Sequence, residues 1–339
     1  MKLKFWAVFL FCTTLSQNAA AVDAGFRYIT TRGTVRCGTD LSAKTYAYKD
    51  EGGYWRGIDA DLCRLFSIAI FGRSDRFEMV GVKSSQVNKA IATNKIDVML
   101  GDVPGTATRD VSGKTTQAEL MYYARQMFLA QKVENASSME AYKGKKVCIV
   151  TNSEDYYNLQ DYSDKYNLDL QMLFFGDRAR AKEAFLLKRC DLYTGSEIYL
   201  KSIYEQINND NMNLTMLPEV VAEKPVYAQI HKDNQTLRIA IKWIMNAMTL
   251  AEKKGINSKN IDIFIGVKDG SVKNLLGINP DLWNKFQLKP DWAKKAITEL
   301  GNYGEIYDRN LGSLSPFEIE RGKNKLIEDG GLIKSQSFF

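Results

Sequence analysis

The sequence has 339 residues but a single histidine, His231, and this scarcity excludes several kinds of site. A Ser-His-Asp triad needs a histidine as its general base, and His231, which follows a predicted strand, is interpreted as a surface residue. The cysteines form no CxxC pair, so a structural zinc site has no support. We therefore expect no catalytic residue, no metal site and no cofactor.

The chain also lacks a P-loop, an internal repeat and a low-complexity tract. Its 46 Lys and Arg residues exceed its 40 Asp and Glu residues, which gives a formal net charge of +6. The basic residues are interleaved with acids and form no stripe with stacking aromatics, which excludes nucleic acid as a partner. A composition of 45% hydrophobic and 25% charged residues is typical of globular proteins, and the length predicts two domains.

Residues 1–21 have the pattern of an export signal. Lys2 and Lys4 precede a mostly apolar run at 5–15, which is too short to span a bilayer. Small residues at 19–21 then offer a cleavage site. An uncleaved anchor is the alternative. Cleavage removes two lysines and no acid, so the formal charge falls to 44 − 40 = +4.

Four cysteines remain after residue 21, and an even number in an exported chain suggests two disulfides. Three pairings are possible. Cys37 lies on the first predicted strand and Cys63 on the next helix, whereas Cys148 and Cys190 each start a predicted strand in the second half. We predict the pairs Cys37–Cys63 and Cys148–Cys190, with four buried thiols as the alternative.

Apolar runs alternate with amphipathic segments along most of the chain, which predicts an α/β fold with parallel strands. Predicted strands are 34–38, 76–82, 96–100, 127–131, 146–150, 170–175, 191–194 and 226–230; predicted helices are 57–72, 84–93, 155–166, 178–188, 197–208 and 235–254. Ser84 is a candidate helix cap and 195–196 a candidate turn. The remainder is expected to be helical as far as 302–304.

Two of these strands, 127–131 and 226–230, are expected to cross between two units. The segment 132–228 then forms a second lobe, while 22–131 and 229–339 form a discontinuous first lobe with a helical C-terminal extension. Two crossings of this kind make a hinge.

The stretch 96–110 ends a buried strand in glycines, hydroxyl residues and Arg109. Ligands of open α/β sheets lie beyond the carboxyl ends of the strands, and a guanidinium there can bind a carboxylate with two parallel hydrogen bonds. A surface ion pair is the alternative for Arg109. In the second half, Ser153 is a predicted N-cap, and a helix N-terminus is a ready anion site.

Several stretches together resemble the family 3 extracytoplasmic solute-binding proteins of bacterial ABC transporters, most closely the general L-amino-acid-binding type. They are Val35-Arg36-Cys37-Gly38 and the segments 55–64, 95–98, 108–110, 188–194 and 301–310. The resemblance extends over about residues 30–333, and all four cysteines stand where this subtype carries them.

The resemblance implies the two-lobed type II (Venus-flytrap) periplasmic binding fold, with a small-molecule ligand held between lobes joined by two hinge strands. It implies that one arginine binds the ligand's α-carboxylate, that neighbouring residues of both lobes assist, and that two further residues lie near the ligand side chain or the mouth. Arg109 matches the arginine that binds the carboxylate. The assisting positions of the two lobes are matched by Asp102, Thr106, Asn152 and Ser153. Asp40 matches the position near the ligand side chain, and Tyr46 matches the one near the mouth. It also implies a periplasmic monomer that delivers its ligand to an inner-membrane ABC permease.

One departure bears on the ligand. Where the family usually has an acid that binds the α-ammonium, this chain has Ser196, with Glu197 beside it. A one-residue shift would let Glu197 serve. Otherwise the ligand is an unusual amino acid or a carboxylate without an α-amine. The same scaffold would also suit a sensor-type binding protein or a dehydratase- or lyase-like enzyme.

Overall fold

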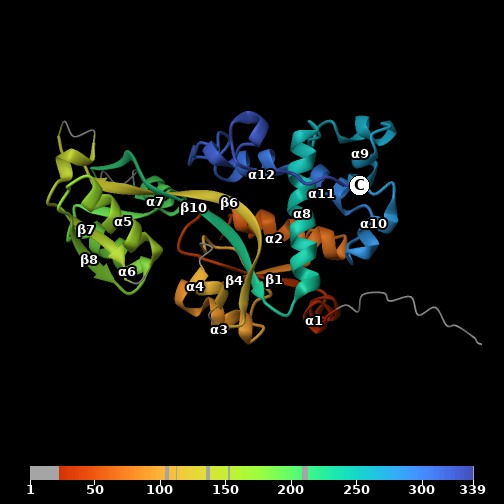
Figure 1. The fold of residues 1–339 in the computed structure, drawn as a ribbon, viewed down its shortest axis with the longest axis horizontal. Coiled ribbons are helices and arrows are strands. Elements are labelled where there is room, and N and C mark those ends of the chain that lie inside the picture. Colours follow the sequence, from red (N-terminus) through yellow and green to blue (C-terminus); the bar gives the residue numbers. More distant parts are fainter. Residues whose placement is uncertain are drawn as a thin grey trace, which may run out of the picture.

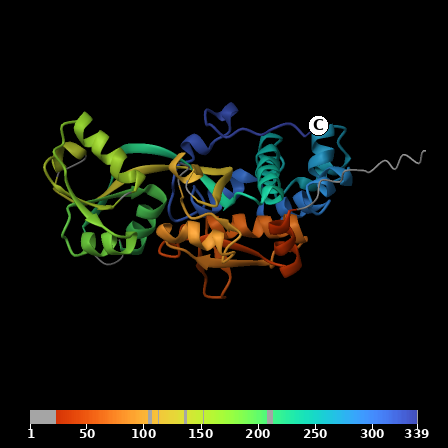
Figure 2. The ribbon, with the colours of Figure 1, turned by 60° about the horizontal axis from the view of Figure 1, so that its bottom comes forward.

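The computed structural model describes residues 23–103, 107–111, 113–134, 138–151, 153–207 and 213–338. Figure 1 shows two bodies joined by two long strands, and the rotated view in Figure 2 shows the same separation. One mixed sheet of eight strands runs through both bodies in the order β4-β1-β5-β10-β6-β9-β7-β8. The α/β fold with two lobes, predicted from the alternation and the resemblance, is thereby confirmed.

Lobe 1 is built on three parallel strands, in which β1 (Val35–Thr39) pairs with β4 (Phe77–Gly81) and with β5 (Val98–Met99). A small hairpin joins β2 (Tyr48–Lys49) to β3 (Trp55–Arg56). The helices of this part are α1 (Ala24–Arg32), α2 (Ile58–Phe71), α3 (Val87–Ala92) and α4 (Ala107–Val111), with a 3₁₀ turn at Ser84–Gln86.

Lobe 2 repeats the arrangement, with β7 (Lys146–Val150) parallel to both β8 (Gln171–Phe175) and β9 (Leu192–Ser196). Its helices are α5 (Glu154–Lys165), α6 (Arg178–Leu186) and α7 (Glu197–Ile207), preceded by a 3₁₀ turn at Met139–Tyr142. Ser153 caps α5, because its side chain accepts a hydrogen bond from the backbone N of Tyr156. The Ser153 N-cap is therefore confirmed.

The crossing strands β6 (Thr115–Gln131) and β10 (Leu214–His231) are much longer than predicted. They pair antiparallel with each other from lobe 1 into lobe 2, with a register shift between Leu217 and Ala222. On its outer edges this ribbon continues the sheet, as β10 pairs with β5 and β6 pairs with β9. Each crossing strand thus belongs to both lobes.

Helix α2 packs against the lobe 1 strands, and Asp59 in its first turn reaches the carboxyl ends of β1 and β5. It contains a nearly unbroken series of buried residues and contacts both β1 and β4. Its N-cap, Gly57, has φ +103°, and a Cβ there would lie 2.4 Å from the carbonyl oxygen of Tyr46. Only glycine permits this approach, so Gly57 fixes Tyr46 against the start of α2.

After the second crossing the chain forms a helical cap on lobe 1, and its last residues return to that cap, where Phe338 packs against Trp243 and Trp283 (Figure 2). The helices are α8 (Gln235–Lys253), α9 (Gly270–Leu275), α10 (Pro280–Lys285), α11 (Trp292–Leu300) and α12 (Tyr303–Asn310), with 3₁₀ turns at Ile261–Gly266, Gly322–Asn324 and Ile327–Asp329. No helix in these described ranges is long and apolar enough to cross a membrane.

Both predicted disulfides are present. Cys37 is bonded to Cys63, which ties β1 to α2, and Cys148 is bonded to Cys190, which ties β7 to the segment before β9. All four cysteines are buried. Each lobe is therefore cross-linked within itself, and neither bond joins the lobes.

Three local predictions are wrong. Ser84 starts a 3₁₀ turn and does not cap α3, whose N-cap Gln86 makes no side-chain bond. Residues 195–196 are the end of β9 and not a turn, because β6 pairs with them. Helical structure does not stop at 302–304: Asn302 and Glu305 form a reciprocal capping box that starts α12.

Candidate functional site

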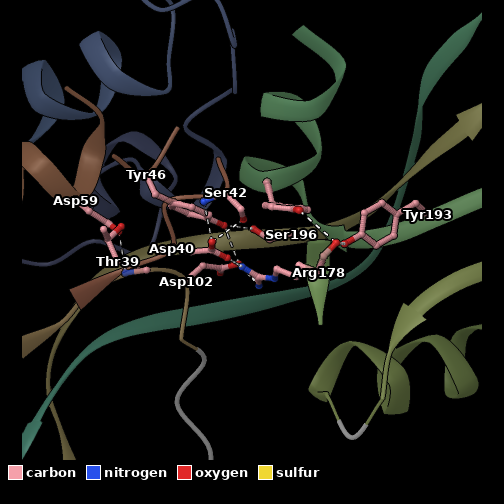
Figure 3. Close-up of polar contacts among 11 residues, drawn as sticks. Thr39, Asp40, Ser42, Tyr46, Asp59, Asp102, Arg178, Tyr193 and Ser196 are labelled. Atoms are coloured by element: carbon pink, nitrogen blue, oxygen red, sulfur yellow. Dashed lines mark hydrogen bonds and ion pairs between the residues drawn. The ribbon is translucent and has the colours of Figure 1, made fainter. Parts of the chain in front are cut away.

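Charged side chains from both lobes meet at the carboxyl ends of β1 and β5 (Figure 3). Arg178, the first residue of α6 in lobe 2, reaches across to lobe 1. Its Nη2 lies 2.8 Å from Asp102 Oδ2 and its Nη1 lies 3.4 Å from Asp40 Oδ2. Burial by itself would lower the pKa of Arg178, but the carboxylates of Asp102 and Asp40 raise it well above its ordinary value. The guanidinium is a permanent cation between two acids.

Asp102 is the centre of this cluster. It lies on the turn after β5 in the left-handed region, with φ +51°, which is uncommon for a residue with a side chain. Its side chain is completely buried. Oδ2 accepts hydrogen bonds from Arg178 and from the Tyr46 hydroxyl, at 2.8 and 2.9 Å. Within the described ranges, Oδ1 has no hydrogen-bond partner.

Tyr46 links Asp102 to lobe 2. Its hydroxyl donates to Asp102 Oδ2 at 2.9 Å, and the same oxygen lies 3.5 Å from Ser196 Oγ at the end of β9, from which it can accept. Burial raises the pKa of Tyr46 well above its ordinary value, and the negative charge of Asp102 raises it further. Tyr46 is thus a neutral donor in the interior of the site, whereas the resemblance predicts a position near the mouth.

Asp59, on the first turn of α2, lies beneath the cluster. Its Oδ2 accepts from Thr39 Oγ1 at 2.6 Å and from the backbone N of Gly101 at 2.9 Å. Burial raises the pKa of Asp59 to about 7. This carboxyl holds together the ends of the two strands that carry Asp40 and Asp102.

On the lobe 2 side, the turn before α5 is closed by its own hydrogen bonds. Ser153 Oγ donates to the carbonyl of Val150 at 2.7 Å while it caps the helix. Next to it, Asp155 forms an ion pair with Lys224 of β10, whose side chain is 2% exposed. Lys224, on the crossing strand β10, is a buried cation, and its pKa is one that burial would lower but that Asp155 and Asp102 raise.

Glu197 is placed away from the Arg178 cluster. Both of its carboxylate oxygens are bound by Arg125 of β6, at 2.7 Å each. Such a two-point pair fixes the start of α7 to the crossing strand. A small cavity of about 20 Å³ adjoins this pair and the C-terminal segment, and Asp40, Asp102 and Arg178 do not line it.

The structure brings Asp40, Tyr46, Asp102 and Ser196 into one cluster and places Ser153 and Glu197 in separate contacts. Thr106, Asn152 and the side chain of Arg109 lie outside the described residues; the backbone of Arg109 is in α4. No group of three or more His, Cys, Asp or Glu residues in the described ranges is arranged to hold a metal.

Sequence reasoning missed three charged residues, Arg178, Asp155 and Lys224. A signal existed for Arg178, because it begins the predicted helix that follows the predicted strand 170–175 after two residues, which places it near the carboxyl edge of the second sheet half. No comparable signal existed for Lys224, which lies inside a strand whose length was underestimated.

Comparison with known proteins places this fold and site in a class. The model for bacterial extracellular solute-binding proteins, family 3, matches residues 35–262. The chain belongs to this family.

Individual relatives extend the likeness along the whole chain. It is 28% identical to the general L-amino acid-binding periplasmic protein AapJ of Rhizobium johnstonii, over 98% of each chain. It is 27% identical to the glutamate/glutamine/aspartate/asparagine-binding protein BztA of Rhodobacter capsulatus, over 91% of each chain. A solved ABC transporter periplasmic binding protein from Brucella ovis, with glutathione bound, superposes with a TM-score of 0.85 at 27% identity, over 92% of this chain and 98% of that one.

Proposed function

We propose that this chain is the periplasmic substrate-binding component of an ABC-type amino-acid transporter. It binds a small carboxylate-bearing ligand, an L-amino acid, between its lobes and delivers it to an inner-membrane permease. One observation carries the proposal: in a family 3 chain, charged groups of both lobes meet at the carboxyl edge of the sheet, where Arg178 contacts Asp102 and Asp40. That edge is where open α/β sheets bind ligands.

In this proposal the lobes are 22–131 with 229–339, and 132–228, and they close by bending β6 and β10. Residues 1–21 are removed on export, and the mature protein acts as a monomer. Arg109 and Thr106 bind the ligand carboxylate together with N–H groups of the turn at Asn152 and Ser153, and Asp40, Tyr46, Asp102 and Ser196 contact the rest of the ligand.

Binding without catalysis is the better account of the titratable groups. Asp59 is the carboxyl near the site whose pKa is raised into the neutral range, a feature that active sites share. Asp59 Oδ2, however, accepts hydrogen bonds from Thr39 and from the backbone N of Gly101. These contacts connect the ends of β1 and β5, which is a structural role. The curated relatives are named as binding proteins, and we propose that this chain is not an enzyme.

A thermal-shift screen of the chain from residue 22 onward tests the function. The panel is the twenty L-amino acids, their deaminated acids and glutathione, the last because the Brucella ovis structure contains it. A bound compound raises the unfolding midpoint by linkage. No shift with any compound contradicts the proposal.

Arg109→Ala then tests the carboxylate site. A charge-assisted hydrogen bond is worth about 1.5–3 kcal/mol, so the dissociation constant measured by calorimetry is expected to rise at least tenfold. Unchanged affinity would remove Arg109 from the site but leave the transport function standing.

A further inference from the structure

We propose that Asp102 is the acceptor for the ligand's ammonium group and that Arg178 neutralises Asp102 until a ligand takes its place. This inference rests on the proposed function and deepens it. It assigns the acidic part of the site to lobe 1, and it gives a lobe 2 arginine the role of an internal, exchangeable cation.

The carboxylate of Asp102 is only partly satisfied. Its side chain is fully buried, and Oδ2 alone receives both Tyr46 and Arg178. Oδ1 lacks a partner among the described residues. A buried carboxylate oxygen left without a donor is costly, and the left-handed backbone at φ +51° adds to that cost. The fold therefore maintains an acceptor that its own described side chains do not use.

The position of this acceptor suits a group held between the lobes. Asp102 belongs to lobe 1, but through Tyr46 it is connected to Ser196 at the end of β9 in lobe 2. Ser196 carries no charge, and Glu197 beside it is bound at both oxygens by Arg125. Of these carboxylates from the two lobes, Asp102 is the one with an open oxygen and a lobe 2 contact.

Arg178 has the contacts of an exchangeable cation. It meets Asp102 at 2.8 Å and Asp40 at 3.4 Å, and its side chain is 21% exposed. When an ammonium group binds Asp102, the guanidinium can stay paired with Asp40. Before binding the two acids share the one cation, and after binding each acid has a cation of its own, so the buried carboxylate of Asp102 is paired with a cation in both states.

Two further contacts between the lobes lie near Arg178. They indicate that the ion pairs of Arg178 also favour closure of the lobes when no ligand is bound. Asp177, the preceding residue, pairs with Lys83 of lobe 1 at 3.2 Å. Ser202 of α7 accepts from the backbone N of Lys44 at 2.9 Å. At the start of α6, the anionic Asp177 and the cationic Arg178 are thus adjacent, and each pairs with an oppositely charged side chain of lobe 1.

The consequence for specificity is direct. A ligand must carry a cationic nitrogen to displace Arg178, so an amino acid is expected to bind and its deaminated acid is not. The test uses calorimetry on the best amino acid of the screen and its deaminated partner, for example L-glutamate with glutarate or L-aspartate with succinate.

For the wild type we expect the amino acid to bind at least tenfold more tightly than the deaminated acid. Asp102→Asn is expected to weaken the amino acid at least tenfold, to change the deaminated acid little, and so to abolish most of the discrimination. Asp75→Asn makes the same chemical change at an exposed carboxylate paired with Arg73 and is expected to keep the wild-type ratio.

An Asp102→Asn protein that keeps the wild-type ratio overturns the inference, although the proposed function survives. If Asp102→Asn does not fold by circular dichroism, Arg178→Gln decides. Loss of the internal cation is expected to tighten amino-acid binding severalfold. Equal or weaker binding overturns the exchange. A wild-type protein that binds no amino acid contradicts the proposed function itself.

Discussion

The side-chain amide of Asn324 pairs with both backbone groups of Tyr123 on β6. Oδ1 accepts from the Tyr123 N at 2.7 Å, and Nδ2 donates to the Tyr123 carbonyl at 2.9 Å. This edge of β6 is free because β9 pairs with β6 only from Gln126 onward. On the other side stands Pro225 of β10, which has no N–H to donate. Asn324 thus replaces a strand partner and ties the C-terminal segment to the hinge.

Asn324→Ala is expected to lower the free energy of unfolding by about 2 kcal/mol, because two hydrogen bonds at about 1 kcal/mol each are lost. Urea denaturation followed by circular dichroism measures the change. Asn284→Ala, at an exposed position of α10, is the control and is expected to be near neutral. Equal midpoints for both variants would mean that this tie contributes nothing to stability.

Arg178→Gln is expected to open the ligand-free protein. The substitution removes the ion pairs to Asp102 and Asp40 and leaves Lys83–Asp177 as a weaker, exposed contact. Small-angle X-ray scattering should give a larger radius of gyration for the ligand-free variant. Arg180→Gln changes an exposed arginine of the same helix and should match the wild type. Identical scattering of both variants would contradict a closing role for Arg178.

The pKa of Asp59, raised by burial to about 7, predicts a pH dependence of stability. Between its ordinary value near 3.8 and 7, the folded protein keeps a proton that the unfolded chain has released. The contribution of Asp59 to the free energy of unfolding therefore falls as the pH rises through this window. The total change is on the order of 4 kcal/mol at about 1.4 kcal/mol per pH unit.

The measurement is the difference between wild type and Asp59→Asn in urea denaturation from pH 4 to pH 8, because this difference cancels the other carboxylates. The wild type should lose stability relative to the variant as the pH rises. A difference that is constant with pH would show that Asp59 is ionised throughout.

The disulfide Cys148–Cys190 spans 42 residues of lobe 2. Removing it with a Cys148→Ser, Cys190→Ser double variant is expected to cost about 4 kcal/mol, from the lost constraint on the unfolded chain. This bond lies within lobe 2, so its removal destabilises lobe 2 and leaves lobe 1 with its own disulfide. In the double variant, lobe 2 should therefore unfold before lobe 1. A calorimetric scan should therefore show two transitions, and a single unshifted transition would contradict this.

Local patterns in the sequence determined much of the scaffold. The apolar run at 146–150 is the strand β7 with those same bounds, and the amphipathic segment 57–72 is α2 at Ile58–Phe71. Both disulfide pairs and the family followed from spacing and order along the chain. Periodicity and short-range order are properties of neighbouring residues, so the sequence displays them directly.

Only the tertiary structure decided the lengths of the crossing strands and the partners of the charged groups. β6 and β10 are extended because they pair with each other across about a hundred residues of chain, and neither has a local pattern over its whole length. Arg178 meets Asp102 from 76 positions away, and Arg125 takes Glu197 from 72. Ion pairs between distant segments depend on how those segments pack in the folded protein. The pattern of neighbouring residues in the sequence does not show which distant side chains come together.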